Sequence, residues 1–171
     1  MQSSGKLDAK VLPLKIEHVN LKTILHASIE AMMPMANDKS INIIFQPPDE
    51  IPMFKADVLQ LRQVFDNLLS NAIKYTSPHG EVNIIIRHDN MVAIAFSDTG
   101  QGIADEELPH VFERFYQTNK ARTRSSVHDG FGLGLSIVHA IIEQHHGKIT
   151  VESKMGKGTI FTVFLPLNNA N

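Results

Sequence analysis

The chain contains no cysteine and no tryptophan among its 171 residues. The absence of cysteine excludes disulfide bonds, thiolate metal sites and cysteine nucleophiles. The longest uninterrupted apolar run, residues 91–96, is far too short to cross a bilayer, and the N-terminal residues lack the apolar segment of a signal peptide. A formal net charge of −2 gives no electrostatic basis for binding nucleic acid. The absence of cysteine is compatible with a cytoplasmic location, and we expect a domain that itself contacts neither membrane nor nucleic acid, whether or not its parent protein is membrane-anchored.

An apolar content of 43% and a charged content of 20% are typical of a folded globular domain, and the length suits a single one. Residues 1–13 are polar and end at Pro13, and we interpret them as a flexible lead-in. Residues 14–167 carry the periodic apolar patterns of the folded domain, and residues 168–171 form a short C-terminal tail.

Residues 57–75 carry the pattern around which the rest of the chain is organised. Apolar side chains recur three and four positions apart, which predicts a helix with one buried face. Asp57 suits the N-cap, and Gln60 three residues later is a variant of the capping box. A polar stripe beside the apolar face consists of Gln63, Asn67, Asn71 and Lys74. Amide oxygens and a cation on one side of a helix would suit a metal–polyphosphate, although an ordinary solvated helix face has the same composition.

The other elements are predicted from shorter patterns. Alternation over residues 14–19 suggests a short edge strand, and an apolar stripe predicts a helix over residues 21–38 that Pro34 kinks or ends. Further strands are expected at 41–45, 82–87, 91–97, 148–152 and 159–165, and a further helix at 134–146 with Gly147 as its left-handed C-cap. Strand hairpins mixed with helices favour an α+β fold in which helices cover one face of a single sheet.

Seven of the ten glycines lie in three clusters that follow the helix predicted at 57–75. The clusters read Asp-Thr-Gly-Gln-Gly-Ile at 98–103, Gly-Phe-Gly-Leu-Gly-Leu at 130–135 and Gly-Lys-Gly-Thr at 156–159. Glycine lets the backbone approach a phosphate or a flat ring closely, and the second cluster opens a helix whose N-terminus favours an anion. Each cluster alone is also consistent with an ordinary turn. The spacings match neither a Walker loop nor the dinucleotide fingerprint.

The order of these motifs is more specific than any one of them. An Asn-rich helix is followed by Asp-x-Gly-x-Gly, by Val-Phe-Glu-Arg-Phe-Tyr at 111–116, by Gly-x-Gly-x-Gly and by Gly-x-Gly-Thr. Over residues 14–167 this arrangement resembles the catalytic ATP-binding domain of bacterial sensor histidine kinases, in the wider group that includes gyrase, heat-shock chaperone and mismatch-repair ATPases. The resemblance implies the Bergerat fold, a two-layer α/β sandwich with a mixed, mainly antiparallel sheet, with ATP and Mg²⁺ bound under a mobile lid.

The resemblance also implies roles for individual residues. Asn71 would be the Mg²⁺ ligand, and Asn67 would support the phosphates and the metal. Asp98 would accept a hydrogen bond from the adenine amino group, joined by Thr159 through water. The remaining implied contacts are Lys74 and Tyr75 on the phosphate and sugar side, Gly100, Gly102 and Ile103 beside the base, and Gly130, Gly132, Leu133, Gly134 and Leu135 at the phosphates.

The lid is expected at residues 117–131, with Phe112 and Phe115 as its anchors. This segment has no strong periodicity and carries three cations, Lys120, Arg122 and Arg124. By composition alone it is a solvated basic loop. Its place beside a triphosphate makes Arg122 and Arg124 candidates for contact with the γ-phosphate, and we count them as candidate catalytic residues with Asn67, Asn71 and Lys74.

One position separates the kinases of this group from its hydrolases. Hydrolytic members carry a glutamate four residues before the metal-binding Asn, where it activates water, whereas this chain has Asn67, which cannot act as a general base. The resemblance therefore implies transfer of the γ-phosphate to a histidine on a separate dimerisation domain, with a response regulator receiver domain downstream. The nine histidines here lie outside the family's His-Glu/Asp-x-Arg context, and we interpret them as surface or structural. Residues 1–13 would be the remnant of the linker from the dimerisation helices.

Alternative functions stay open on the sequence alone. A hydrolytic ATPase of the same fold would release phosphate steadily without a partner. A regulatory module that uses nucleotide only as a structural ligand would bind a partner protein and transfer nothing. A serine-directed kinase of the same fold is a further possibility.

Overall fold

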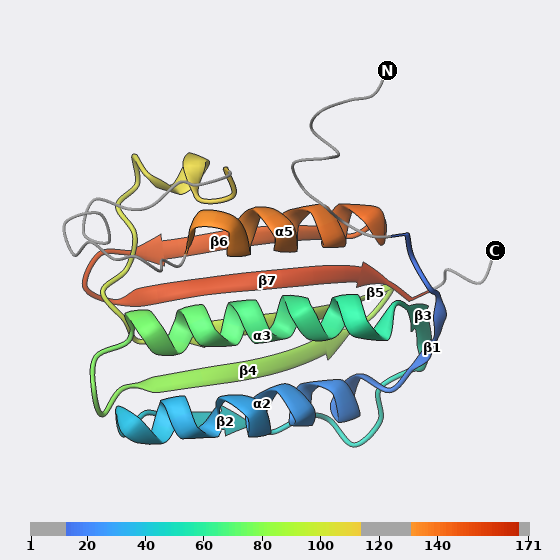
Figure 1. Ribbon diagram of the computed structural model, residues 1–171, viewed down its shortest axis with the longest axis horizontal. Helices are drawn as coiled ribbons and strands as arrows, with labels where there is room; N and C mark the ends of the chain where they lie inside the picture. The colour runs from blue at the N-terminus through green and yellow to red at the C-terminus, as the bar shows by residue number, and fades with distance from the viewer. Residues whose placement is uncertain (1–12, 114–130, 168–171) are drawn as a thin grey trace.

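The computed structural model describes residues 13–113 and 131–167. Their elements are, in chain order, β1 (Glu17–Val19), α2 (Leu21–Asp38), β2 (Asn42–Phe45), β3 (Phe54–Ala56), α3 (Val58–Tyr75), β4 (Glu81–His88), β5 (Met91–Asp98), the 3₁₀ turn η1 (Leu108–His110), α5 (Phe131–Gln144), β6 (Lys148–Lys154) and β7 (Gly158–Pro166). Figure 1 shows α2, α3 and α5 side by side over one face of a sheet. The α+β sandwich predicted from the sequence is confirmed. In the described part of the chain, every helix is too short or too polar to span a bilayer.

The main sheet has five strands in the order β2-β4-β5-β7-β6. β2 pairs with β4 in parallel, and the other neighbouring strands are antiparallel, so the mixed, mainly antiparallel sheet is confirmed. The register sets Asp98, the last residue of β5, opposite Thr159 near the start of β7. β1 and β3 form a separate two-stranded antiparallel sheet. The expectation of a single sheet was therefore wrong.

α3 lies in the middle of the helical layer, between α2 and α5 (Figure 1). Its apolar face is fully buried against the sheet, and the ring of Phe65 lies 5.9 Å from that of Phe96 on β5. Each large side chain buried in this way stabilises the fold by about 1.5–3 kcal/mol. Because the apolar face is fixed on the sheet, the rotation of α3 is fixed too. That rotation places Asn71 at the edge of the core, where only 6% of its surface is exposed.

The first turn of α3 is held by hydrogen bonds to the side chain of Asp57. Its Oδ1 atom accepts from the backbone N–H of Gln60 at 3.0 Å, which confirms the predicted N-cap. Its Oδ2 atom accepts from the N–H of Lys15 at 2.8 Å. The N–H of Asp57 donates to Nε2 of His145 at 3.0 Å, and Nδ1 of that ring donates to the carbonyl of Ile141 at 2.9 Å. His145 thus joins the end of α5 to the start of α3, a structural role of the kind expected.

Several boundaries differ from the sequence predictions. The first strand is confined to Glu17–Val19, and its partner β3 was not predicted because three residues after a Pro-rich turn carry too little pattern. α2 spans Leu21–Asp38, the predicted bounds, and continues through Pro34, so of the two expected effects of Pro34, a kink or an early end, the early end is excluded. Glu30 and Pro34 are both exposed, and water can therefore satisfy the carbonyl that Pro34 leaves without a donor.

α5 begins at Phe131, three residues before the predicted start, and ends at Gln144. The residue in the left-handed conformation after it is His146, with φ 63°, so the prediction for Gly147 was wrong by one position. Gly147 donates its N–H to the carbonyl of Ile142 at 3.0 Å, and His146 donates to that of Glu143 at 2.9 Å. This is the paired pattern of a Schellman motif. Gly147 is required for space, because a Cβ there would lie 2.1 Å from the carbonyl oxygen of Phe164.

Candidate functional site

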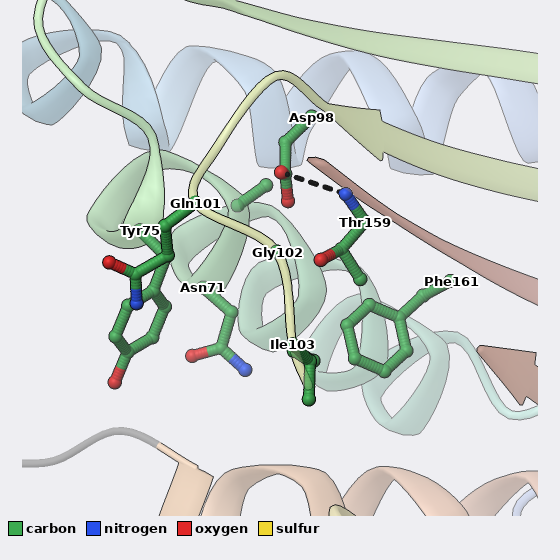
Figure 2. A pocket seen from close by; sticks show the side chains of 9 residues that line it. Asn71, Tyr75, Asp98, Gln101, Gly102, Ile103, Thr159 and Phe161 are labelled. Atoms are coloured by element: carbon green, nitrogen blue, oxygen red, sulfur yellow. Dashed lines mark hydrogen bonds between the residues drawn. The ribbon is translucent and has the colours of Figure 1, made fainter. Parts of the chain in front are cut away.

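A pocket lies between the C-terminal half of α3, the loop after β5 and the start of β7 (Figure 2). Polar groups are few and stand among apolar side chains. The lining residues are Asn71, Ala72, Tyr75, Asp98, Gln101, Gly102, Ile103, Thr159 and Phe161. Asn71 and Asp98, 27 positions apart in the sequence, therefore border one cavity.

Asp98 stands at the end of β5 and is oriented by two backbone donors. Its Oδ1 atom accepts from the N–H of Gly100 at 2.9 Å and from the N–H of Thr159 at 3.2 Å. Figure 2 shows the other carboxylate oxygen on the pocket side, and no described residue donates a hydrogen bond to it. Burial raises the pKa of Asp98 to about 6, although the two N–H groups oppose this rise. At neutral pH the pocket therefore contains a carboxylate with one oxygen available to a ligand.

Asn71 lies at the opposite side of the pocket from Asp98 (Figure 2). Its Nδ2 atom is buried and has no hydrogen-bond partner among the described residues. A buried amide without a partner costs about 1–3 kcal/mol, and such groups mark sites that a ligand or ion completes. Asn67 lies one helical turn earlier on α3, and a Cβ built on Gly134 would be 3.6 Å from its Oδ1 atom. The Asn side chains of α3 thus lead from the pocket to the first turn of α5.

The loop after β5 borders the pocket in a conformation that its glycines permit. Gly102 has φ 82°, and a Cβ there would lie 2.2 Å from the carbonyl oxygen of Lys154. No other residue fits both conditions. The next residue, Ile103, donates its N–H to Oγ of Ser153 at 2.7 Å. This hydrogen bond therefore holds the loop after β5 against the β6–β7 hairpin beside the pocket.

The first turn of α5 and the segment after η1 extend the site beyond the pocket. The first four N–H groups of an α-helix have no acceptor within it, and in α5 they belong to residues 131–134. Phe112 packs with its ring 5.4 Å from that of His139 on α5 and 6.0 Å from that of Phe161 on β7. The predicted lid anchor at Phe112 thus contacts both α5 and the pocket wall.

The other predicted site residues are placed as follows. Tyr75, Gly102 and Ile103 line the pocket beside Asn71, Asp98 and Thr159. Gly100 is buried, and Leu135 is part of the core. Lys74 is exposed on α3 and does not line the pocket. Gly132 and Leu133 belong to the first turn of α5. Phe115, Arg122, Arg124 and Gly130 lie outside the described residues, as does most of the expected lid.

Four residues at this site were not predicted from the sequence. Ala72, Gln101 and Phe161 line the pocket, and Ser153 connects Ile103, Gly158 and Thr159 through its hydroxyl group. Gln101 lies inside a glycine cluster and Phe161 two residues after another, so proximity to these motifs was an available signal. Ser153 offered none, because it reaches the site only through the pairing of β6 with β7.

The donor set suits a magnesium ion that is shared with a ligand. The described residues contain no cluster of three His, Asp or Glu side chains that could enclose a metal. Mg²⁺ commonly takes one or two protein oxygens and completes its shell with phosphates and water. The amide oxygens of Asn71 and of Asn67 one turn earlier are ligands of this kind, whereas the unpartnered Nδ2 atom of Asn71 is a donor and suits a phosphate oxygen.

A family model described as "Histidine kinase-, DNA gyrase B-, and HSP90-like ATPase" matches residues 56–169. The chain belongs to this family. Within it, the chain corresponds to the catalytic domain of a sensor histidine kinase. The sensor histidine kinase ZraS of Escherichia coli strain K12 is 37% identical over 156 residues, which are 91% of this chain and 32% of ZraS.

Solved structures of histidine kinases support the same assignment. The catalytic domain of histidine kinase ThkA has a TM-score of 0.77 and 26% identity, covering 90% of this chain and 98% of that one. Full-length ShkA in complex with AMPPNP has a TM-score of 0.80 and 30% identity, covering 95% of this chain and 33% of ShkA. ThkA has also been solved with the response regulator protein TrrA.

The histidine kinase catalytic domain described here spans only part of its curated relatives. It covers 32% of ZraS and 24% of RppB from Synechocystis, to which it is 46% identical over 109 residues.

Proposed function

We propose that this domain binds Mg-ATP with the adenine in the pocket and the phosphates directed toward the first turn of α5. The main support is that Asp98 and Asn71 border the same cavity, and that each has a polar atom without a hydrogen-bond partner among the described residues. A carboxylate oxygen accepts a hydrogen bond from an amino group such as that of adenine. The apolar walls at Ile103 and Phe161 suit the faces of a flat ring.

Asn67 and Asn71 would hold a magnesium ion together with the phosphates. When bound there, Mg²⁺ would neutralise charge that develops on the phosphates during transfer. The N–H groups of residues 131–134, which have no acceptor within α5, and the positive end of the α5 dipole favour the phosphate oxygens in the same region. Lys74, Arg122 and Arg124 remain the candidate cations for the outer phosphates.

We further propose that the γ-phosphate passes to a histidine of a separate dimerisation domain. The attacking imidazole nitrogen forms the new P–N bond while the bond to the bridging oxygen breaks, and ADP leaves. Asn67 stands where a hydrolase needs a base, and an amide cannot take a proton from water. The bound ATP is thus kept for a nucleophile that the partner domain supplies.

A response regulator receiver domain is the proposed second partner of the parent protein. This follows from the ThkA–TrrA complex, in which a kinase of the same fold was solved with a response regulator. The receiver would take the phosphoryl group from the histidine of the dimerisation domain. We also propose that this domain acts in the cytoplasm, where ATP is supplied.

Phosphate transfer from γ-labelled ATP to a separately produced dimerisation domain tests the proposal. Acid-labile label on the partner and none on this chain is the expected result. The variant Asn71→Asp, which places a negative charge beside the phosphates, should abolish the label. Steady phosphate release without a partner would instead indicate a hydrolase, and binding of the partner without label would indicate a regulatory module.

A further inference from the structure

The hydroxyl group of Ser153 lies at the centre of a hydrogen-bond network behind the base pocket. Its Oγ atom is 2.7 Å from the N–H of Ile103, 2.9 Å from the carbonyl oxygen of Gly158 and 2.8 Å from Oγ1 of Thr159. The partners come from the loop after β5 and from the first two residues of β7. Ser153 itself does not line the pocket, whereas Thr159 does.

The direction of each bond in this network follows from proton count. A serine hydroxyl has one proton to donate and two lone pairs that accept. The carbonyl of Gly158 can only accept, so the proton of Ser153 points to it. The N–H of Ile103 can only donate, so it occupies one lone pair of Ser153. The remaining lone pair of Ser153 must take the contact with Thr159, and the Thr159 hydroxyl therefore donates its proton away from the pocket.

This direction decides what Thr159 can offer to a ligand. With its proton used on Ser153, the Oγ1 atom has only lone pairs left for the pocket. Its neighbour Asp98, whose Oδ1 accepts from the N–H of Thr159, also presents only an acceptor when ionised. The base edge of the pocket therefore accepts hydrogen bonds from two atoms and donates none. Such an edge favours a purine with an amino group at C6 and disfavours one with a carbonyl oxygen there.

We propose that Ser153 is a positioning residue for base selection, which acts by fixing the hydroxyl of Thr159 as an acceptor toward the pocket. The proposal rests on the proposed binding of adenine nucleotide in this cavity. By fixing this hydroxyl, Ser153 gives the pocket its selectivity for an amino group, which Thr159 contacts either directly or through a bridging water. Without it, the hydroxyl of Thr159 is free to rotate and to donate to a carbonyl oxygen.

The test compares the dissociation constants of ADP and inosine 5′-diphosphate, in which a carbonyl oxygen replaces the amino group at C6 and N1 carries a proton. Wild-type protein should bind ADP more tightly. In Ser153→Ala the ratio of the two constants should fall by about three- to tenfold, the value of one hydrogen bond. Ser153→Thr, which keeps the hydroxyl, should restore the ratio. A purely structural role would weaken both nucleotides equally and leave the ratio unchanged, and that result would overturn the proposal.

A double-mutant cycle shows whether Ser153 acts through Thr159. In a Thr159→Val background, Ser153→Ala should no longer change the ratio, and a further change there would contradict the proposal. Should Ser153→Ala fail to fold, Ser153→Cys carries the same expectation, because a thiol is a weak donor and acceptor. Absence of ADP preference in the wild type would count against the proposed function instead. The two failures are thereby distinguishable.

Discussion

Nucleotide binding by this domain should weaken as the pH falls through about 6. The reason is the buried carboxyl of Asp98, whose pKa burial raises from 3.8 to about 6. Only the ionised carboxylate can accept a hydrogen bond from the adenine amino group while its other oxygen accepts from the N–H groups of Gly100 and Thr159. Protonation removes the binding-competent form, and the apparent dissociation constant rises in proportion.

The size of the effect follows from the fraction of Asp98 that stays ionised. At pH 8 nearly all of it is ionised, at pH 6 about half, and at pH 5 about one-tenth. The apparent dissociation constant of ADP should therefore rise about twofold between pH 8 and pH 6 and about elevenfold between pH 8 and pH 5. Isothermal titration calorimetry with magnesium present, over this pH range, measures the change.

A matched variant separates the titration of Asp98 from that of the nucleotide phosphates, which also gain protons near pH 6. Asp98→Asn has nearly the same shape and does not titrate, so its ADP binding should be weaker and should keep only the pH dependence of the phosphates. The ratio of the two proteins' dissociation constants should then change about tenfold between pH 8 and pH 5. A constant ratio would refute the assignment of Asp98 to the base.

Without nucleotide, the free energy of unfolding should fall as the pH rises through 6. The folded protein holds the proton of Asp98 up to about pH 6, while the unfolded chain releases it near 3.8. This carboxyl therefore stabilises the fold below pH 4, and its contribution is lost as the pH rises through 6. The full difference is about 3 kcal/mol. Denaturant unfolding of wild type and Asp98→Asn between pH 4 and pH 7 measures it, and parallel pH profiles for the two proteins would contradict it.

Three further predictions concern backbone strain, the incompletely bonded amide and the junction of the helices. Gly102→Ala should lower the free energy of unfolding by more than about 3 kcal/mol, measured with denaturant. Gly156 has the same φ of 82° but no atom within 4 Å of an added Cβ, so Gly156→Ala should cost only about 1–2 kcal/mol. Equal losses in the two variants would show that crowding at Gly102 is unimportant. Asn71→Leu should raise the unfolding midpoint of the free domain and remove the gain in ADP affinity that magnesium gives, and a variant that keeps this gain would exclude Asn71 as a metal ligand. His145→Leu should lower stability by about 1–3 kcal/mol, because the N–H of Asp57 loses its acceptor, and unchanged stability would mean that water replaces the ring.

Local pattern was enough to predict α3 and its polar stripe. The helix has 18 residues, its apolar spacing is regular and its N-cap bond is made within four residues of sequence. These features depend on neighbouring residues alone, so they can be read before any tertiary contact is known. The same holds for the strand pair β4 and β5, which a tight turn joins.

Elements that depend on distant partners were predicted less well. β1 and β3 have three residues each and exist because they pair with one another across 34 intervening positions. Pro34 remains within α2 because the surrounding turn faces solvent. After α5 the left-handed residue is His146, and Gly147 lies where the carbonyl oxygen of Phe164 leaves no space for a Cβ. In each case the surroundings in the folded domain, either a tertiary contact or exposure to solvent, outweighed local propensity.

The sequence by itself determined the chemical groups of this domain: the amides of α3, the carboxylate of Asp98 and the glycines that bend the chain around them. Only the tertiary structure decided their state. Burial raised the pKa of Asp98 and left the amide of Asn71 without a partner, and both effects arise when packing removes water from these groups. The pairing of β6 with β7 likewise brought Ser153 to Thr159. Spacing along the chain carries no information about desolvation or proton direction, because both depend on which groups the fold brings together.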